Sequence, residues 1–271
     1  MVKSGWVGKI IYIIVILSSI SICLIGIRSK ANQEQQRKVE YAKSTIKSEA
    51  VKIKRLNKQI RQLYQNDQEE FLVEPIEKAK IKDIERDIII LKTEAVDFGL
   101  KSKDFLTDNS EVWQGKKELL LKIEEVKNKS GIQKRVSDLL VQAPTDWTTE
   151  NLDVVIKENT TAEDIIKIRN DVSKMKDQWS EAITSVLDQM DVQVKQYNEI
   201  KQSIAEMNRD GVLTSEANME NFIFIFNQLS EIKNETLKKE LSDQLDVIDK
   251  LLEKQAIDGS ATEQDEVQPN E

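Results

Sequence analysis

The sequence predicts an all-α protein with a single N-terminal transmembrane helix, followed by a coiled-coil hairpin and helical hairpins of spectrin-like character. Three observations support this fold class. Residues 10–27 form an uncharged apolar run, the 271 residues include only 8 Gly and 3 Pro, and 32% of them are charged. Few turn-forming residues and many charges are typical of long helices that bury narrow apolar stripes.

Residues 10–27 are the predicted membrane anchor, preceded by a short N-terminal tail at residues 1–9. As a helix this run spans roughly 27 Å, which is close to the thickness of the hydrocarbon core of a bilayer. A signal peptide needs small residues at its cleavage site, and Lys30 separates Ser29 from Ala31. A lipidation site at Cys23 is disfavoured because apolar residues continue beyond it. We therefore expect an uncleaved anchor whose partner is the lipid bilayer.

Residues 31–100 predict a membrane-proximal coiled-coil hairpin. Apolar residues recur with heptad spacing over residues 31–65, and Glu49 interrupts them once. The a positions are Val39, Ile46, Ile53 and Ile60, and the d positions are Ala42, Leu56 and Leu63. After a polar turn at residues 66–68, a second stripe comprises Ile81, Ile84, Ile88, Leu91, Ala95 and Phe98. Two stripes joined by a short turn favour an antiparallel hairpin. A parallel homodimer through the four a-position residues is the alternative.

The remaining chain is divided by turn-forming residues. We expect a first helical hairpin at residues 101–143, with a turn at Lys127-Asn128 and Gly131, and a linker with a long helix at residues 144–211. Thr160 and Glu163 are spaced as a capping box, and the helix that they begin would run to Asp210-Gly211. A second hairpin follows at residues 212–255. Residues 256–271 lack apolar periodicity and predict a disordered acidic tail.

One pattern occurs twice, at residues 119–140 and 225–245. The two copies align on Lys127-Asn128 and Lys233-Asn234, and a Ser-Asp pair recurs in each. This unit resembles the short helical repeats in surface regions of Gram-positive membrane and wall proteins. It is also similar to the helical extracellular part of the streptococcal division-site positioning proteins. The layout of one anchor plus helical repeats resembles the spectrin-like septation-ring regulators, whose helical part would be cytoplasmic.

The composition disfavours catalysis. The chain has no histidine, and its one cysteine, Cys23, lies in the anchor. The commonest general base and the usual zinc ligands are therefore missing. We find no phosphate-binding, dinucleotide-binding or nucleophile-elbow motif. The sequence accordingly predicts no catalytic, cofactor-binding or metal-binding residues, no cofactor and no nucleic-acid partner.

Charge gives conflicting information about orientation. Between Ala31 and Tyr64, six Lys and three Arg stand against three Glu, a net charge of +6, whereas residues 240–271 carry a net charge of −8. Positive charges after the anchor favour a cytoplasmic soluble region, where a basic helix can lie beside anionic lipid. The resemblance instead implies an extracytoplasmic one.

These observations predict a non-enzymatic, membrane-tethered interaction or scaffold protein of the bacterial cell envelope. We expect a single-pass protein of the cell membrane with its soluble region outside. The alternatives are a cytoplasm-facing coiled-coil scaffold of a division or secretion machine and an enzyme of unrecognised type.

Overall fold

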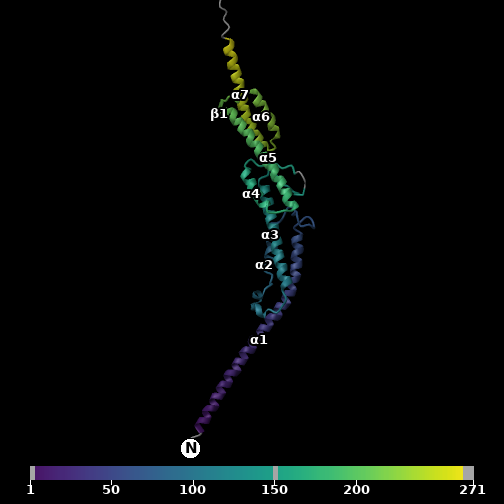
Figure 1. The fold of residues 1–271 in the computed structure, drawn as a ribbon, viewed down its shortest axis with the longest axis vertical. Helices are drawn as coiled ribbons and strands as arrows, with labels where there is room; N and C mark the ends of the chain where they lie inside the picture. Colours follow the sequence, from purple (N-terminus) through teal and green to yellow (C-terminus); the bar gives the residue numbers. More distant parts are fainter. Residues whose placement is uncertain (1–3, 149–151, 265–271) are drawn as a thin grey trace, which may run out of the picture. The chain divides into compact units, whose positions relative to one another are not determined.

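In the computed structural model, seven α-helices form most of the described chain, residues 4–148 and 152–264 (Figure 1). Within these residues, strands are limited to a two-stranded antiparallel ribbon, β1 (Asn208–Arg209) and β2 (Val212–Leu213). The predicted all-α class is therefore confirmed. The chain divides into two compact units. The first contains the described chain up to Leu63 together with Glu77–Lys127, and the second contains Tyr64–Ile76 and the described chain from Asn128 onward.

Helix α1 (Ser4–Arg61) runs without a break from the apolar segment into the heptad region. The predicted N-terminal tail is therefore helical from Ser4, and residues 1–3 lie outside the described part. The described side chains between Ile11 and Ile27 are exposed. The hydroxyls of Ser19 and Ser21 donate to carbonyls one turn earlier, each at 2.8 Å, so their polarity is satisfied within the helix. In the described chain, α1 is the one helix long and apolar enough to cross a membrane.

The first unit buries the heptad seam of α1 inside the chain. Helix α2 (Lys78–Ile89) and the 3₁₀ helix η1 (Ala95–Phe98) contact α1. Helix α3 (Ser110–Asp138) approaches it at Gly115, beside Ile53. The seam residues that become fully buried are Ala42, Ile46, Leu56, Ile60 and Leu63. Glu49, which interrupts the pattern, is also buried, and one of its carboxylate oxygens pairs with Lys52 Nζ at 2.9 Å.

The second stripe of the hairpin is shorter as a helix than its sequence pattern predicts. Helix α2 ends at Ile89, and the stripe members Leu91 and Phe98 reach the core from a loop and from η1. The cause is the carboxylate of Asp97, which accepts hydrogen bonds from the backbone N–H groups of Thr93 at 2.7 Å and Glu94 at 2.9 Å. This capping stabilises a new helical start in place of a continued helix.

The predicted turn at Lys127-Asn128 and Gly131 is wrong. Helix α3 continues through all three residues, because the buried residues on both sides of them, including Val126, Ile132 and Val136, keep the spacing of one helical stripe. The second copy of the sequence pattern does turn at Lys233-Asn234, between the 3₁₀ helix η3 (Leu229–Glu231) and α7 (Glu235–Gln264). The two copies therefore adopt different local structures.

The second unit contains α4 (Ala162–Val172), α5 (Gln178–Met207), α6 (Met219–Gln228) and α7 around a common core that includes Trp147 and Trp179. The long helix predicted from the Thr160 and Glu163 capping box to Asp210-Gly211 is broken at residues 173–177. Asp177 caps α5 by accepting from the N–H of Ser180 at 2.9 Å, and Ser180 closes a capping box. This second helix start overrides the continuous apolar stripe.

Three further predictions in this unit concern the start of α4, the end of α5 and the C-terminal tail. The N-cap of α4 is Thr161, whose side chain accepts from the N–H of Asp164, and not Thr160 as expected. The predicted helix stop at Asp210-Gly211 is wrong by three residues, because α5 ends at Met207. Asp210 and Gly211, with positive φ of 52° and 84°, instead form the tight turn between β1 and β2. The predicted disordered tail is wrong for residues 256–264, which continue α7 although Gly259 and Thr262 have weak helix propensity. Residues 265–271 lie outside the described part.

Two glycines of α3 test the continuous helix. A Cβ added at Gly131 would meet nothing within 4 Å, so Gly131→Ala should stabilise the protein by about 0.5–1 kcal/mol through lower unfolded-chain entropy and better helix propensity. The measurement is denaturant unfolding of the full chain in detergent micelles, followed by circular dichroism. A loss of stability would instead indicate the turn that the sequence suggested.

Gly115→Ala is the matched control. Its Cβ would lie 2.9 Å from Ile53 Cγ2, so the same substitution in the same helix should give no gain or a loss. Equal gains at the two positions would contradict the close approach of α1 and α3.

Candidate functional site

The sequence predicted no catalytic, cofactor or metal residues, so the candidate sites come from the structure. Within the described residues, no group of three or more acidic, cysteine or histidine side chains is placed to hold a metal ion. Two features of the second unit are distinctive. One is an open cavity beside the start of α7, and the other is a buried lysine in α3.

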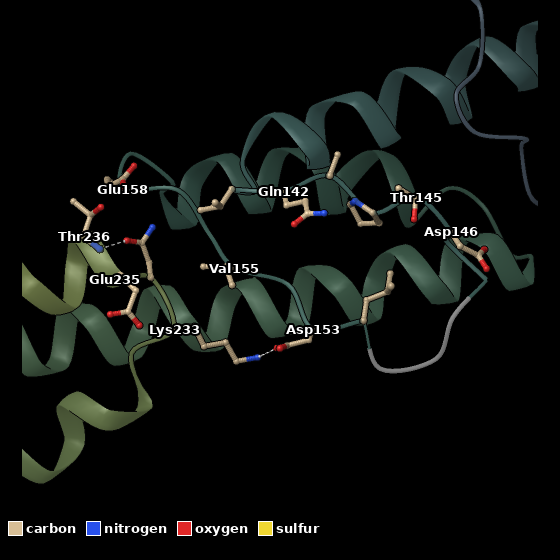
Figure 2. A pocket seen from close by; sticks show the side chains of 14 residues that line it. Gln142, Thr145, Asp146, Asp153, Val155, Glu158, Lys233, Glu235 and Thr236 are labelled. Atoms are coloured by element: carbon tan, nitrogen blue, oxygen red, sulfur yellow. Dashed lines mark hydrogen bonds and ion pairs between the residues drawn. The ribbon is translucent and has the colours of Figure 1, made fainter.

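The cavity has a volume of about 570 Å³ and is lined by residues 141–146, 152–153, 155, 158 and 233–236 (Figure 2). Its first wall contains the predicted linker around Pro144, which is irregular as expected. Its second wall is an extended segment that pairs with the first wall at one end, where the N–H of Val141 donates to the carbonyl of Val155 at 2.8 Å. The third wall is the turn into α7.

Two buried amide side chains hold the extended segment in place. Gln193 donates to the carbonyl of Val154 at 2.9 Å and accepts from the N–H of Ile156 at 3.3 Å, as a neighbouring strand would. Asn234 donates to the carbonyl of Ile156 at 2.7 Å. The same Asn234 side chain caps α7 by accepting from the N–H of Leu237 at 3.0 Å. The cavity walls are therefore fixed by hydrogen bonds to buried groups.

The charged groups that line the cavity are four carboxylates and one lysine, Lys233. Lys233 Nζ lies 2.6 Å from a carboxylate oxygen of Asp153, in an ion pair largely exposed to solvent. A hydrogen bond from its own backbone N–H lowers the pKa of Glu158, and bonds with the Thr236 and Asn234 side chains lower it further. Glu158 is therefore ionised at neutral pH and acts as an acceptor.

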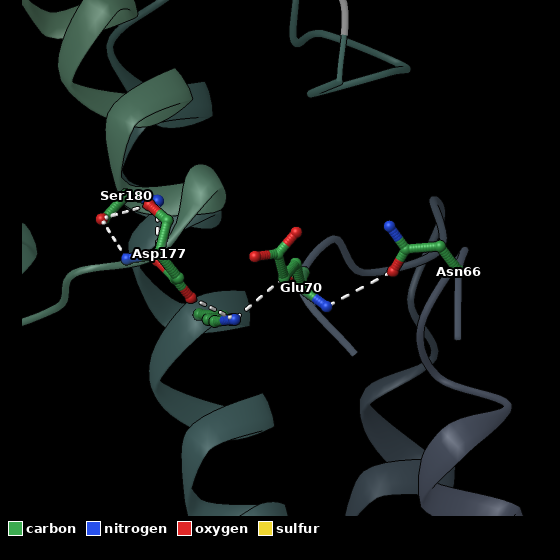
Figure 3. Close-up of polar contacts among 5 residues, drawn as sticks. Asn66, Glu70, Asp177 and Ser180 are labelled. Carbon is green, nitrogen blue, oxygen red and sulfur yellow. Dashed lines mark hydrogen bonds and ion pairs between the residues drawn. The ribbon is translucent and has the colours of Figure 1, made fainter. Parts of the chain in front are cut away.

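Lys129 is the most unusual polar residue of the unit, because only 1% of its surface is exposed. Its Nζ donates to a carboxylate oxygen of Asp177 at 2.7 Å and to the carbonyl of Glu70 at 2.9 Å (Figure 3). The ammonium group also faces the rings of Tyr64 and Trp179, at 5.7 and 5.5 Å from their centroids. Both rings are suited to stabilise a buried cation.

These contacts join three segments that are distant in sequence. Lys129 lies in α3, Asp177 caps α5, and Glu70 belongs to a loop in which Phe71 and Leu72 are buried. Burial raises the pKa of Asp177, but the hydrogen bond from Lys129 and the N–H of Ser180 outweigh it, so the pKa is below its ordinary value. The carboxylate is ionised at neutral pH and neutralises the buried ammonium.

Sequence analysis missed both features. Lys129 occupies a position in the apolar stripe of α3 between Val126 and Val136, and a charge in a buried stripe is a detectable sign of a buried ion pair. The supposed turn at Gly131 concealed it by ending the stripe too early. The partners of Gln193 and Asn234 come from segments far away in sequence, and no local pattern predicts them.

Comparisons with protein-family models, with curated proteins and with solved structures gave no match to this chain.

The buried ion pair is testable by substitution. Asp177→Asn keeps a capping side chain but leaves the Lys129 ammonium without its counter-ion, and it should destabilise the second unit by roughly 3 kcal/mol. Lys129→Met should cost less, because Asp177 keeps a quarter of its side chain exposed, at 25%. The double variant should cost clearly less than the sum of the two single variants. Denaturant unfolding of the three variants measures these differences.

The matched control is Asp171→Asn. Asp171 pairs with Arg135 of the same helix α3, also at 2.7 Å, but both side chains are more than 40% exposed. This substitution should cost less than about 1 kcal/mol. The lowered pKa of Asp177 adds a pH criterion: its contribution is present above the unfolded pKa of about 3.9 and is lost as pH falls through the lower folded pKa. Additive costs, or equal costs for Asp177→Asn and Asp171→Asn, would contradict the account.

Proposed function

We propose that this chain is a non-enzymatic, membrane-tethered helical interaction or scaffold protein of the bacterial cell envelope. The observation that carries the proposal is the continuity of α1. Its exposed apolar segment leads directly into a heptad seam that the first unit buries. An anchor and a folded unit that share one helix are suited to hold binding surfaces at a fixed place near a bilayer.

Membrane insertion accounts for the exposed apolar side chains between Ile11 and Ile27. Left in water they would cost about 25 cal/mol per Å² of apolar surface, whereas the hydrocarbon core accommodates them. The hydrocarbon core offers no hydrogen-bond partners, and an α-helix satisfies its backbone N–H and C=O groups by hydrogen bonds within the segment. A signal sequence would pass the same length and composition test. We favour an anchor because α1 continues helically through Arg28-Ser29-Lys30-Ala31 into the folded unit.

The stretch between the anchor and the bundle acts as a spacer in this proposal. Residues 28–38 of α1 are exposed on all sides, and the first fully buried residue is Ala42. At 1.5 Å per residue, the helix from Ile27 to Ala42 spans roughly 22 Å. The Lys and Arg side chains of this stretch stay hydrated at the bilayer surface, whichever leaflet the stretch leaves. Tethering also raises the effective concentration of the chain for partners at the membrane.

The orientation has two candidate answers. The resemblance to Gram-positive surface and division-site proteins favours an extracytoplasmic soluble region, which we propose. The excess of positive charge after the anchor favours the cytoplasm-facing scaffold of a division or secretion machine. A role as an enzyme of unrecognised type is the third candidate, and no motif of the sequence favours it.

A parallel homodimer through Val39, Ile46, Ile53 and Ile60 stays an alternative. It competes with packing within the chain, because Ile46 and Ile60 are 5% and 0% exposed in one copy. A dimer would have to open the first unit to use this seam. We therefore propose that α1 packs in its own chain, and that homodimerisation, if present, uses another surface.

Topology is the direct test. In a Cys23→Ser background, a cysteine is introduced either at Ser215, an exposed position of the second unit, or at Ser4, before the anchor. Intact cells without their wall are treated with a membrane-impermeant maleimide. We expect Ser215→Cys to react before lysis and Ser4→Cys to react only after it.

The opposite labelling pattern would replace our proposal with the cytoplasm-facing scaffold. Release of the Ser215→Cys protein into the medium, without its N-terminal segment, would show a cleaved signal sequence and overturn the tether.

A further inference from the structure

Helix α6 carries more apolar surface than its own chain covers. Within Met219–Gln228 only Ile225 is fully buried. Met219, Ile223 and Phe226 are 55%, 51% and 56% exposed, although they are large apolar residues. Isolated exposed apolar side chains are normal on a protein surface, but several on adjacent turns of one helix mark a contact surface.

These residues form one continuous arc. At about 100° per residue, Ile225, Phe222, Phe226, Met219 and Ile223 follow one another around roughly 160° of the helix. The first part of the arc packs on the core of the second unit, where Phe222 is half-buried. The second part, which we call the α6 stripe, comprises Met219, Ile223 and Phe226 and faces solvent. The arc is therefore wide enough for one further helix beside α6.

The α6 stripe is also held in a fixed geometry. The rings of Phe222 and Phe226 stack with centroids 6.2 Å apart and an interplanar angle of 18°. Phe222 in turn packs on the core, so the exposed Phe226 ring rests on an ordered neighbour. Aromatic side chains that are ordered before binding lose little entropy on association and are typical binding hot spots.

The charge of the chain segment that carries the stripe favours one kind of occupant. Residues 210–232, between Arg209 and Lys233, contain no Lys or Arg, whereas Asp210, Glu216, Glu220 and Glu231 are acidic. A second copy of the same stripe would bring two acidic segments together, and an anionic bilayer would repel this segment. A helix with an apolar stripe and basic flanks would complement it.

We propose that the α6 stripe is a docking surface for an amphipathic partner helix with basic flanks, in the manner of helix-to-helix recognition. The proposal deepens the proposed function, since it rests on this chain being an interaction protein. It does not depend on the orientation of the anchor.

The test uses the full chain in nanodiscs of neutral lipid and two synthetic helical peptides. The peptides share one apolar stripe, but one has Lys and Arg on its polar face and the other has Glu. We expect fluorescence anisotropy to show binding of the basic peptide that Ile223→Asp weakens roughly tenfold or more. The matched control is Ile166→Asp on α4, because Ile166 is exposed to a similar extent, 53%, and should leave binding unchanged.

Ile223→Asp also makes the chain more acidic, so a purely electrostatic attraction would strengthen in that variant. No binding of the basic peptide, equal binding of the acidic one, or equal effects of the two substitutions would overturn the proposal. Self-association that Ile223→Asp abolishes, measured by sedimentation, would assign the stripe to a second copy and also overturn it. Failure of the tether appears separately in maleimide labelling, which the α6 stripe does not influence.

Discussion

Burial of the α1 seam by its own chain is the constraint on which the structure of the first unit depends. The heptad pattern alone is equally compatible with a parallel dimer, because a and d residues only require another apolar stripe. In this chain α2, η1 and α3 supply that stripe, and Gly115 permits α3 to approach Ile53 closely. The same packing holds the C-terminal half of α1 in place, while the described side chains of its apolar segment between Ile11 and Ile27 are exposed. One helix thus has a packed segment within the first unit and an exposed apolar segment outside it.

The sequence predicted the features that depend on periodicity and composition. The helical class, the apolar run and the seam of α1 all follow from local patterns, and the structure contains each of them. Errors arose where a capping side chain starts a new helix within a long apolar stripe that predicts one continuous helix. Asp97 and Asp177 each begin a new helix by capping, and both interrupt stripes that looked continuous. At Gly131 the opposite happened, because packing on both sides overrides the weak helix propensity of glycine.

The candidate sites were much less predictable than the fold. The cavity depends on Gln193 and Asn234, whose partners in the extended segment lie 37 or more positions away in the sequence. The Lys129 pair depends on a loop, a cap and two aromatic rings from separate segments. Such sites arise from tertiary contacts, which periodicity does not describe. The α6 stripe lies between these cases: its apolar residues are visible in the sequence, but only the structure tells which part of the arc the core uses.

The continuity of α1 from its apolar segment to the packed seam of the first unit is the central claim, and a distance measurement tests it most directly. Spin labels would be attached to cysteines introduced at the exposed positions Ser29 and Ser48, in a Cys23→Ser background, with the full chain in nanodiscs. An unbroken helix predicts a narrow distance distribution, with roughly 28 Å between the two Cα atoms. A broad or clearly shorter distribution would show a break after the apolar segment. It would contradict the view that one helix links this segment to the folded chain.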